Sequence, residues 1–194
     1  KLYGYDNYLK YCRNQMYWGI FNKRPVQKVP NVRYTSWAAY ADGDIYNKGA
    51  MLMHTLRTQM ENDALFMRIL KDMQIEFRDT TITSAEFEAY FLEKCECDLQ
   101  AIFDRMLRVA DAPELAYSVF INEDKNTAEL KYRWAEGTPT NYPMKIKFIA
   151  GEEVFYIEPK SEAQFISLPV NVEYKMQPWL SGYFTTVSFD GKKK

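Results

Sequence analysis

The chain has 194 residues, of which 47% are hydrophobic and 26% charged, and its formal net charge is −1. These values allow one large domain or two small ones with a packed core, and they argue against disorder. The near-zero charge argues against nucleic-acid binding, and the sequence has no run of about 18 apolar residues that could form a membrane segment.

Up to about residue 112 the hydrophobic residues recur every three or four positions, which is the spacing of amphipathic helices. The first stripe consists of Tyr5, Leu9, Cys12, Met16 and Ile20. Pro25 and Pro30 interrupt this pattern, so the residues from there to Gly43 are expected to form an irregular loop.

Four further helices are expected, each preceded by a residue that can cap its N-terminus. These residues are Asp44, Asn62, Thr83 and Asp98. Thr83 and Glu86 have the spacing of a capping box, in which each side chain accepts a hydrogen bond from the backbone of the other residue. The short connections between these helices predict an antiparallel α-helical array.

After Pro113 the hydrophobic period changes to two, as expected for strands with one buried and one wet face. Alternating apolar residues include Leu130, Tyr132, Trp134, Met144, Ile146 and Phe148. Further apolar runs lie at 117–121, 154–157, 165–172 and 183–189. Six or seven such strands predict an antiparallel β-sandwich. The fold class is therefore α+β, with a helical domain over residues 1–112 and a β-sandwich over residues 113–194.

Several residue types that often carry chemistry are expected to be structural here. The three cysteines, Cys12, Cys95 and Cys97, do not form a disulfide framework and are expected to be small buried hydrophobic residues. The single histidine, His54, has no partner ligands at metal-binding spacing, so we expect it to be a core or boundary residue. The helical carboxylates, at positions 61, 63, 86, 88, 93 and 96, are interpreted as capping or solvated charges.

Tyr46 is the candidate catalytic residue. It lies in the expected first turn of a helix, where a protonated phenol can donate a hydrogen bond to an oxyanion and the helix dipole favours the same negative charge. The residues alone leave a second interpretation open, in which Tyr46 simply packs at a helix start. Gly49, inside the same turn, suggests close approach by another backbone or a ligand.

Several short motifs follow one another in a fixed order over about residues 34–113. They are Tyr46-Asn47-Lys48-Gly49-Ala50, Leu56-Arg57, Phe66, Thr80-Thr81-Ile82-Thr83 leading to Phe87, Asp98-Leu99, Phe103 and Pro113. Together they resemble the zinc-dependent gluzincin aminopeptidases of the aminopeptidase N type. By architecture the resemblance continues to about residue 189, through the Leu130-x-Tyr132-x-Trp134 strand and Pro143-Met144. Two departures are Met106, where the family usually has tryptophan, and Cys97, where it often has a small polar residue.

The resemblance implies a fragment of a zinc metallo-aminopeptidase, a hydrolase that removes N-terminal residues from peptides. Residues 1–112 would be the C-terminal part of a thermolysin-like catalytic domain. The family holds zinc with H-E-x-x-H and a glutamate on the next helix, and this sequence contains neither, so the ligands are expected upstream of Lys1. In that family a zinc-bound water attacks the peptide carbonyl. Only Tyr46 is carried over, as a donor to the tetrahedral oxyanion, and the fragment itself is expected to bind no metal and to be inactive.

A second hypothesis is a non-catalytic helical-plus-β-sandwich module for binding or scaffolding. In that case exposed aromatic residues such as Trp37, Trp134 and Trp179 would bind a peptide or a sugar. An alternating tryptophan within a strand, such as Trp134, is more typical of a sandwich core than of a ligand platform. The sequence upstream of Lys1 discriminates between the two hypotheses, because only the first requires H-E-x-x-H there.

Overall fold

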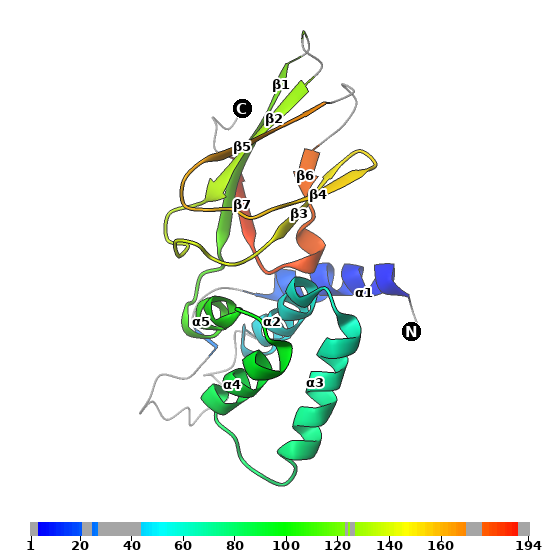
Figure 1. Ribbon diagram of the computed structural model, residues 1–194, viewed down its shortest axis with the longest axis vertical. Coiled ribbons are helices and arrows are strands. Elements are labelled where there is room, and N and C mark those ends of the chain that lie inside the picture. The colour runs from blue at the N-terminus through cyan, green and yellow to red at the C-terminus, as the bar shows by residue number, and fades with distance from the viewer. Residues whose placement is uncertain are drawn as a thin grey trace. The chain divides into compact units, whose positions relative to one another are not determined.

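The computed structural model describes residues 4–20, 25–26, 44–122, 124, 127–169 and 176–189. It divides into two compact units, Lys1–Asp111 and Ala112–Lys194. Helices form the first unit and β-sheets dominate the second, so the expected α+β class and the order of its two parts are confirmed (Figure 1). Most of the loop expected before Gly43, including Trp37, lies outside the described residues. No described helix has the length and apolar character needed to cross a membrane.

The first unit contains five α-helices among its described residues. They are α1 (Tyr5–Tyr11), α2 (Asp44–Met60), α3 (Asp63–Glu76), α4 (Ser84–Cys95) and α5 (Gln100–Arg108). The chain after α1 forms a π-helical turn, Cys12–Met16, and then a 3₁₀ turn, Tyr17–Gly19. These changes of helical pitch break the single stripe expected from Tyr5 to Ile20, and Cys12 is buried while Tyr5 is exposed.

The expected capping residues can be compared with the observed N-termini of the helices. Asn62 caps α3 by accepting a hydrogen bond from the backbone N–H three residues on. The capping box is also confirmed, since the Thr83 hydroxyl accepts from the N–H of Glu86 at 3.2 Å and the Glu86 carboxylate accepts from the N–H of Thr83 at 2.7 Å. The expected Asp98 cap is wrong, because α5 begins one residue later, after the buried Leu99, and has no side-chain cap.

The helices α2 to α5 contact one another in a closed ring. The helix α2 contacts α3 and α5, and α4 contacts the same two helices. Aromatic rings fill the interior where Phe91 of α4 packs edge-on against Phe66 of α3 and Phe103 of α5, with centroid distances of 6.1 and 5.7 Å. This packing fixes the position of α5, against which the start of α2 lies.

The second unit consists of two sheets. Its strands are β1 (Glu114–Asn122), β2 (Thr127–Trp134), β3 (Ile146–Ala150), β4 (Glu153–Ile157), β5 (Gln164–Pro169), β6 (Met176–Pro178) and β7 (Thr186–Phe189). One sheet has the order β5-β2-β1-β7 and the other β4-β3-β6. Tyr117 of β1 packs edge-on against Phe148 of β3 at 5.6 Å, so side chains of the two sheets meet in a common core.

One strand pair departs from the expected antiparallel pattern. The strands β1 and β7 pair in parallel, with Glu114 opposite Thr186. The other four strand pairs are antiparallel. Parallel neighbours require a long crossover, and the hydrophobic period of a strand does not show the direction of its partner.

Candidate functional site

Tyr46 is the third residue of α2 and its side chain is 63% exposed. The helix packs by other residues, among them the buried Met51, Leu52 and Leu56. The phenol is therefore open to contact from outside the described part of the unit. A side chain that is this exposed does not match the second interpretation, in which Tyr46 packs at the start of the helix.

Lys48 lies two residues after Tyr46, which places it about 200° away around the helix. It is fully buried. Its Nζ donates hydrogen bonds to the backbone carbonyls of Val109, at 2.7 Å, and Ala110, at 2.5 Å. These carbonyls follow directly after α5, where the helix dipole favours a positive charge. Lys48 therefore ties the first turn of α2 to the end of α5.

Burial is the main influence on the ionisation of Lys48. It lowers the pKa of the ammonium group from 10.5 to about 8. Asp44 and Asp111 raise this pKa and Arg105 lowers it further, but none of these charges matches the effect of burial. The lysine thus carries a charge at neutral pH at an energetic cost.

Asn47 provides a second attachment for the same turn. Its side-chain amide donates to the carbonyl of Gly19 at 3.0 Å. Gly19 has no side chain in the way, and a Cβ there would overlap the Asn47 amide. Glycine at this position therefore permits the hydrogen bond between α2 and the 3₁₀ turn.

Gly49 lies three residues after Tyr46, and residues at this spacing share a helix face. The sequence suggested that another backbone or a ligand comes close to this glycine. Within the described residues the suggestion is not supported, because no atom lies within 4 Å of the position that a Cβ would take. The helix surface beside Tyr46 is thus bare of described neighbours.

The turn of α2 consequently has two different sides. Asn47 and Lys48 attach it to two other segments of the chain, whereas the Tyr46 side chain is exposed and no described atom lies within 4 Å of a Cβ at Gly49. A donor for a charged intermediate needs both properties, a fixed backbone and an accessible hydroxyl.

His54 lies in the interior of the helical unit. It is buried, and its Nδ1 lies 2.9 Å from the hydroxyl of Tyr8. The two rings pack edge-on, and burial raises the pKa of Tyr8 to about 12. The expected structural role is confirmed. Across the described residues, no group of three or more His, Cys, Asp or Glu side chains could hold a metal ion.

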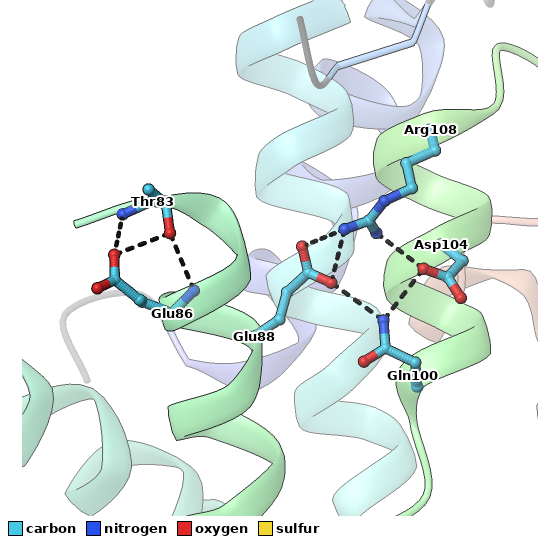
Figure 2. Close-up of polar contacts among 6 residues, drawn as sticks. All are labelled: Thr83, Glu86, Glu88, Gln100, Asp104 and Arg108. Atoms are coloured by element: carbon cyan, nitrogen blue, oxygen red, sulfur yellow. Dashed lines mark hydrogen bonds and ion pairs between the residues drawn. The ribbon is translucent and has the colours of Figure 1, made fainter. Parts of the chain in front are cut away.

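Glu88 corrects the interpretation of the helical carboxylates as solvated or capping charges. It is 3% exposed, and Figure 2 shows its carboxylate between α4 and α5. Both its oxygens accept from Arg108, at 2.8 and 3.0 Å, and Gln100 donates to it at 3.0 Å. Arg108 also reaches Asp104 at 2.8 Å. Glu88 is satisfied by this network and acts as a link between two helices.

The cysteines are a second correction. Cys95 and Cys97, at the end of α4, form a disulfide instead of packing as buried hydrophobic residues. Cys12 is free and buried, as expected. A spacing of two residues is uncommon for a disulfide, and the left-handed conformation of the intervening Glu96, with φ of 52°, brings the two cysteines together.

Two of the three tryptophans of the binding-module hypothesis can be placed. Trp134 is 1% exposed, and its indole N–H donates to the carbonyl of Tyr142 at 3.2 Å, so it belongs to the core. Trp179 is half-buried, packs edge-on against Tyr183 and lies under the ammonium group of Lys147. Neither is an open platform for a ligand.

Sequence reasoning missed the role of Lys48 because lysine is usually exposed. A signal was present in the spacing. Positions 48, 51, 52 and 55 follow the three-four pattern of one helix face, and all four residues are buried. A lysine on such a face is a candidate for a buried, hydrogen-bonded cation.

No family model matches the sequence, and no curated protein matches it. Among solved structures, the chain is similar to the crystal structure of Legionella pneumophila aminopeptidase A in complex with aspartic acid, with a TM-score of 0.59 and 13% identity. The match covers 79% of this chain and 18% of that chain. The likeness shows a fold shared with a small part of an aminopeptidase.

Proposed function

We propose that this chain is part of a zinc-dependent aminopeptidase of the gluzincin type, which removes N-terminal residues from peptides. In this proposal the helical unit is the C-terminal part of the catalytic domain, and the second unit is the following β-sandwich. Tyr46 donates a hydrogen bond to the oxyanion of the tetrahedral intermediate.

The accessibility of Tyr46 at a fixed helix start is the observation that supports this function. A phenol that is 63% exposed can reach a substrate, while Lys48 and Asn47 hold the backbone that carries it. The N-terminus of α2 also favours negative charge nearby, which adds to the stabilisation of an oxyanion. The shared fold with part of an aminopeptidase is consistent with this placement.

The described residues of this chain do not fit a zinc site. They contain no suitable cluster of ligands, and the only histidine in the sequence is buried against Tyr8. We therefore assign the zinc and its ligands to polypeptide outside these 194 residues. What this chain contributes is a hydroxyl group that donates a hydrogen bond to the developing charge.

The main test is Tyr46→Phe in the protein that combines this chain with the zinc site. Loss of one oxyanion donor lowers kcat by about 10² to 10³. KM changes little, because the bond forms with the intermediate and not with the ground state. Release of a chromophore from an aminoacyl 4-nitroanilide measures both constants.

Tyr11→Phe is a matched control, because Tyr11 is another exposed tyrosine of the same unit. It should leave kcat unchanged, and both variants should keep the melting temperature of the parent. If Tyr46→Phe retains full kcat, Tyr46 has no part in the reaction.

The isolated chain gives a second test. It should bind less than stoichiometric zinc by elemental analysis and should not hydrolyse the same substrate. One zinc per chain, or turnover that is abolished by a chelator, would contradict the assignment of the metal to other polypeptide.

A further inference from the structure

We propose that Lys48 is a positioning residue for Tyr46, since it fixes the first turn of α2 and thereby the direction of the phenol. The catalytic meaning of this role rests on the proposed function, but the positioning itself is a property of this chain alone.

The argument begins with the weakness of helix starts. The first turn of a helix has backbone N–H groups without partners inside the helix, and it frays more readily than the middle. Tyr46 lies in this turn. A catalytic donor there needs an external attachment, because an error of about 1 Å in its position can cost about 10² in rate.

Lys48 provides this attachment with backbone atoms as its partners. The carbonyls of Val109 and Ala110 are fixed relative to α5, whose Phe103 packs into the aromatic interior of the unit. Two bonds to neighbouring carbonyls also define a direction, whereas an apolar contact would allow the turn to slide. Asn47 binds Gly19 in the same turn, so the backbone on both sides of Asn47 is held.

The burial of Lys48 has an energetic cost, which its two hydrogen bonds offset in part. Burial disfavours its charge enough to lower its pKa to about 8. A methionine has a similar length and would fill the same space, but it would leave the carbonyls of Val109 and Ala110 without these donors and would remove a positive charge near the buried Asp44. What the methionine cannot supply is the pair of directed hydrogen bonds.

The experiment places 4-fluorophenylalanine at position 46 and observes its ¹⁹F resonance in the intact chain. This probe has no ionisable group, so it reports only the surroundings of the ring. We compare the parent with Lys48→Met, and Lys71→Met is the matched control because Lys71 is an exposed lysine of α3. Melting temperatures show that each variant is folded.

The parent and the control should share one sharp resonance. Lys48→Met should shift it towards the value of the free amino acid or split it, and amide exchange in the first turns of α2 should accelerate roughly tenfold. The melting temperature of Lys48→Met should be lower than that of the parent, because two carbonyls lose their donor. An unchanged resonance in a folded Lys48→Met chain would overturn the proposal.

If Lys48→Met does not fold, the parent chain supplies the test. Raising the pH from 7 to 9.5 neutralises Lys48, which weakens both hydrogen bonds by removing the positive charge of their donor, so the resonance should move with a midpoint near pH 8. Burial has the largest effect on this midpoint, and the nearby charged groups Asp44, Arg105 and Asp111 adjust it. A resonance that does not respond to pH contradicts the proposal.

These outcomes separate the two proposals. If the ring moves in Lys48→Met but Tyr46→Phe keeps full kcat, the positioning stands and the oxyanion role of Tyr46 fails. If the ring stays in place but Tyr46→Phe loses activity, the reverse is true.

Discussion

Two of the charged side chains that the helical unit buries, Lys48 and Glu88, lie in very different surroundings. Glu88 accepts two hydrogen bonds from a guanidinium group and one from an amide, and the bond to Glu88 raises the pKa of Arg108. Lys48 donates to neutral carbonyls, and burial lowers its pKa despite two nearby carboxylates. The first arrangement links helices with a compensated charge, and the second links them through a charge that burial disfavours.

Removing the partner of Glu88 should have the largest effect on stability. Arg108→Ala leaves a buried carboxylate without its counter-charge and should lower the free energy of unfolding of the helical unit by about 2–3 kcal/mol. This is below the full cost of breaking a buried pair, because the Arg108 side chain is 36% exposed. Urea unfolding followed by far-UV circular dichroism measures the change.

Two further variants sharpen this first prediction. Arg68→Ala is the control, since Arg68 is an exposed arginine of α3, and its effect should stay within about 0.5 kcal/mol. The double variant Glu88→Leu/Arg108→Leu should recover most of the loss, because it removes both charges together. A loss below about 0.5 kcal/mol in Arg108→Ala would show that Glu88 does not depend on its partner.

The free energy of unfolding should depend on pH through Lys48, because burial disfavours the charge of this lysine. Its pKa is about 8 in the folded chain and near 10.5 in the unfolded chain, so between these values the unfolded state binds more protons. Stability from this group therefore rises with pH in that window, by about 1–2 kcal/mol between pH 8 and 9.5.

The measurement compares urea unfolding of the parent with that of Lys48→Met across this range. The difference between the two curves isolates Lys48 from other groups. Work below pH 10 avoids Tyr8, whose raised pKa of about 12 makes stability fall as the pH rises from about 10 to 12. If the free energies of unfolding of the two proteins change with pH in parallel, burial does not disfavour the charge of Lys48.

Gly49→Ala should have the smallest effect and the opposite sign. A Cβ at this position meets no described atom, and alanine is favoured over glycine inside a helix, so the helical unit should gain about 0.5–1 kcal/mol. Gly182→Ala makes a useful contrast, because its Cβ would overlap the ring of Trp179 and should destabilise the second unit. Destabilisation by Gly49→Ala would show that another part of the chain lies against this surface.

Local patterns in the sequence predicted local structure well. The capping box joins Thr83 and Glu86 within a segment of four residues, and it forms as expected. Alternation likewise located β2, in which Leu130, Tyr132 and Trp134 all face the core. In each case the information lies within one helix turn or one strand.

Features that depend on distant partners could not be predicted in this way. The burial of Glu88 depends on Arg108 of the next helix, and that of Lys48 on carbonyls more than sixty residues away. At the candidate site the sequence identified Tyr46 and its helix turn. It did not show which neighbours hold that turn, since the partners of Asn47 and Lys48 are apparent only in the folded chain.

The parallel pairing of β1 with β7 has a consequence for synthesis on the ribosome. The hydroxyl of Thr185, just before β7, donates to the carbonyl of Pro113, which lies 72 residues earlier. One edge of β1 therefore lacks its described neighbour, β7, until residues 186–189 have left the exit tunnel. During that interval the nascent sheet presents a free edge of the kind that joins other chains, and chaperone protection should matter most at this stage.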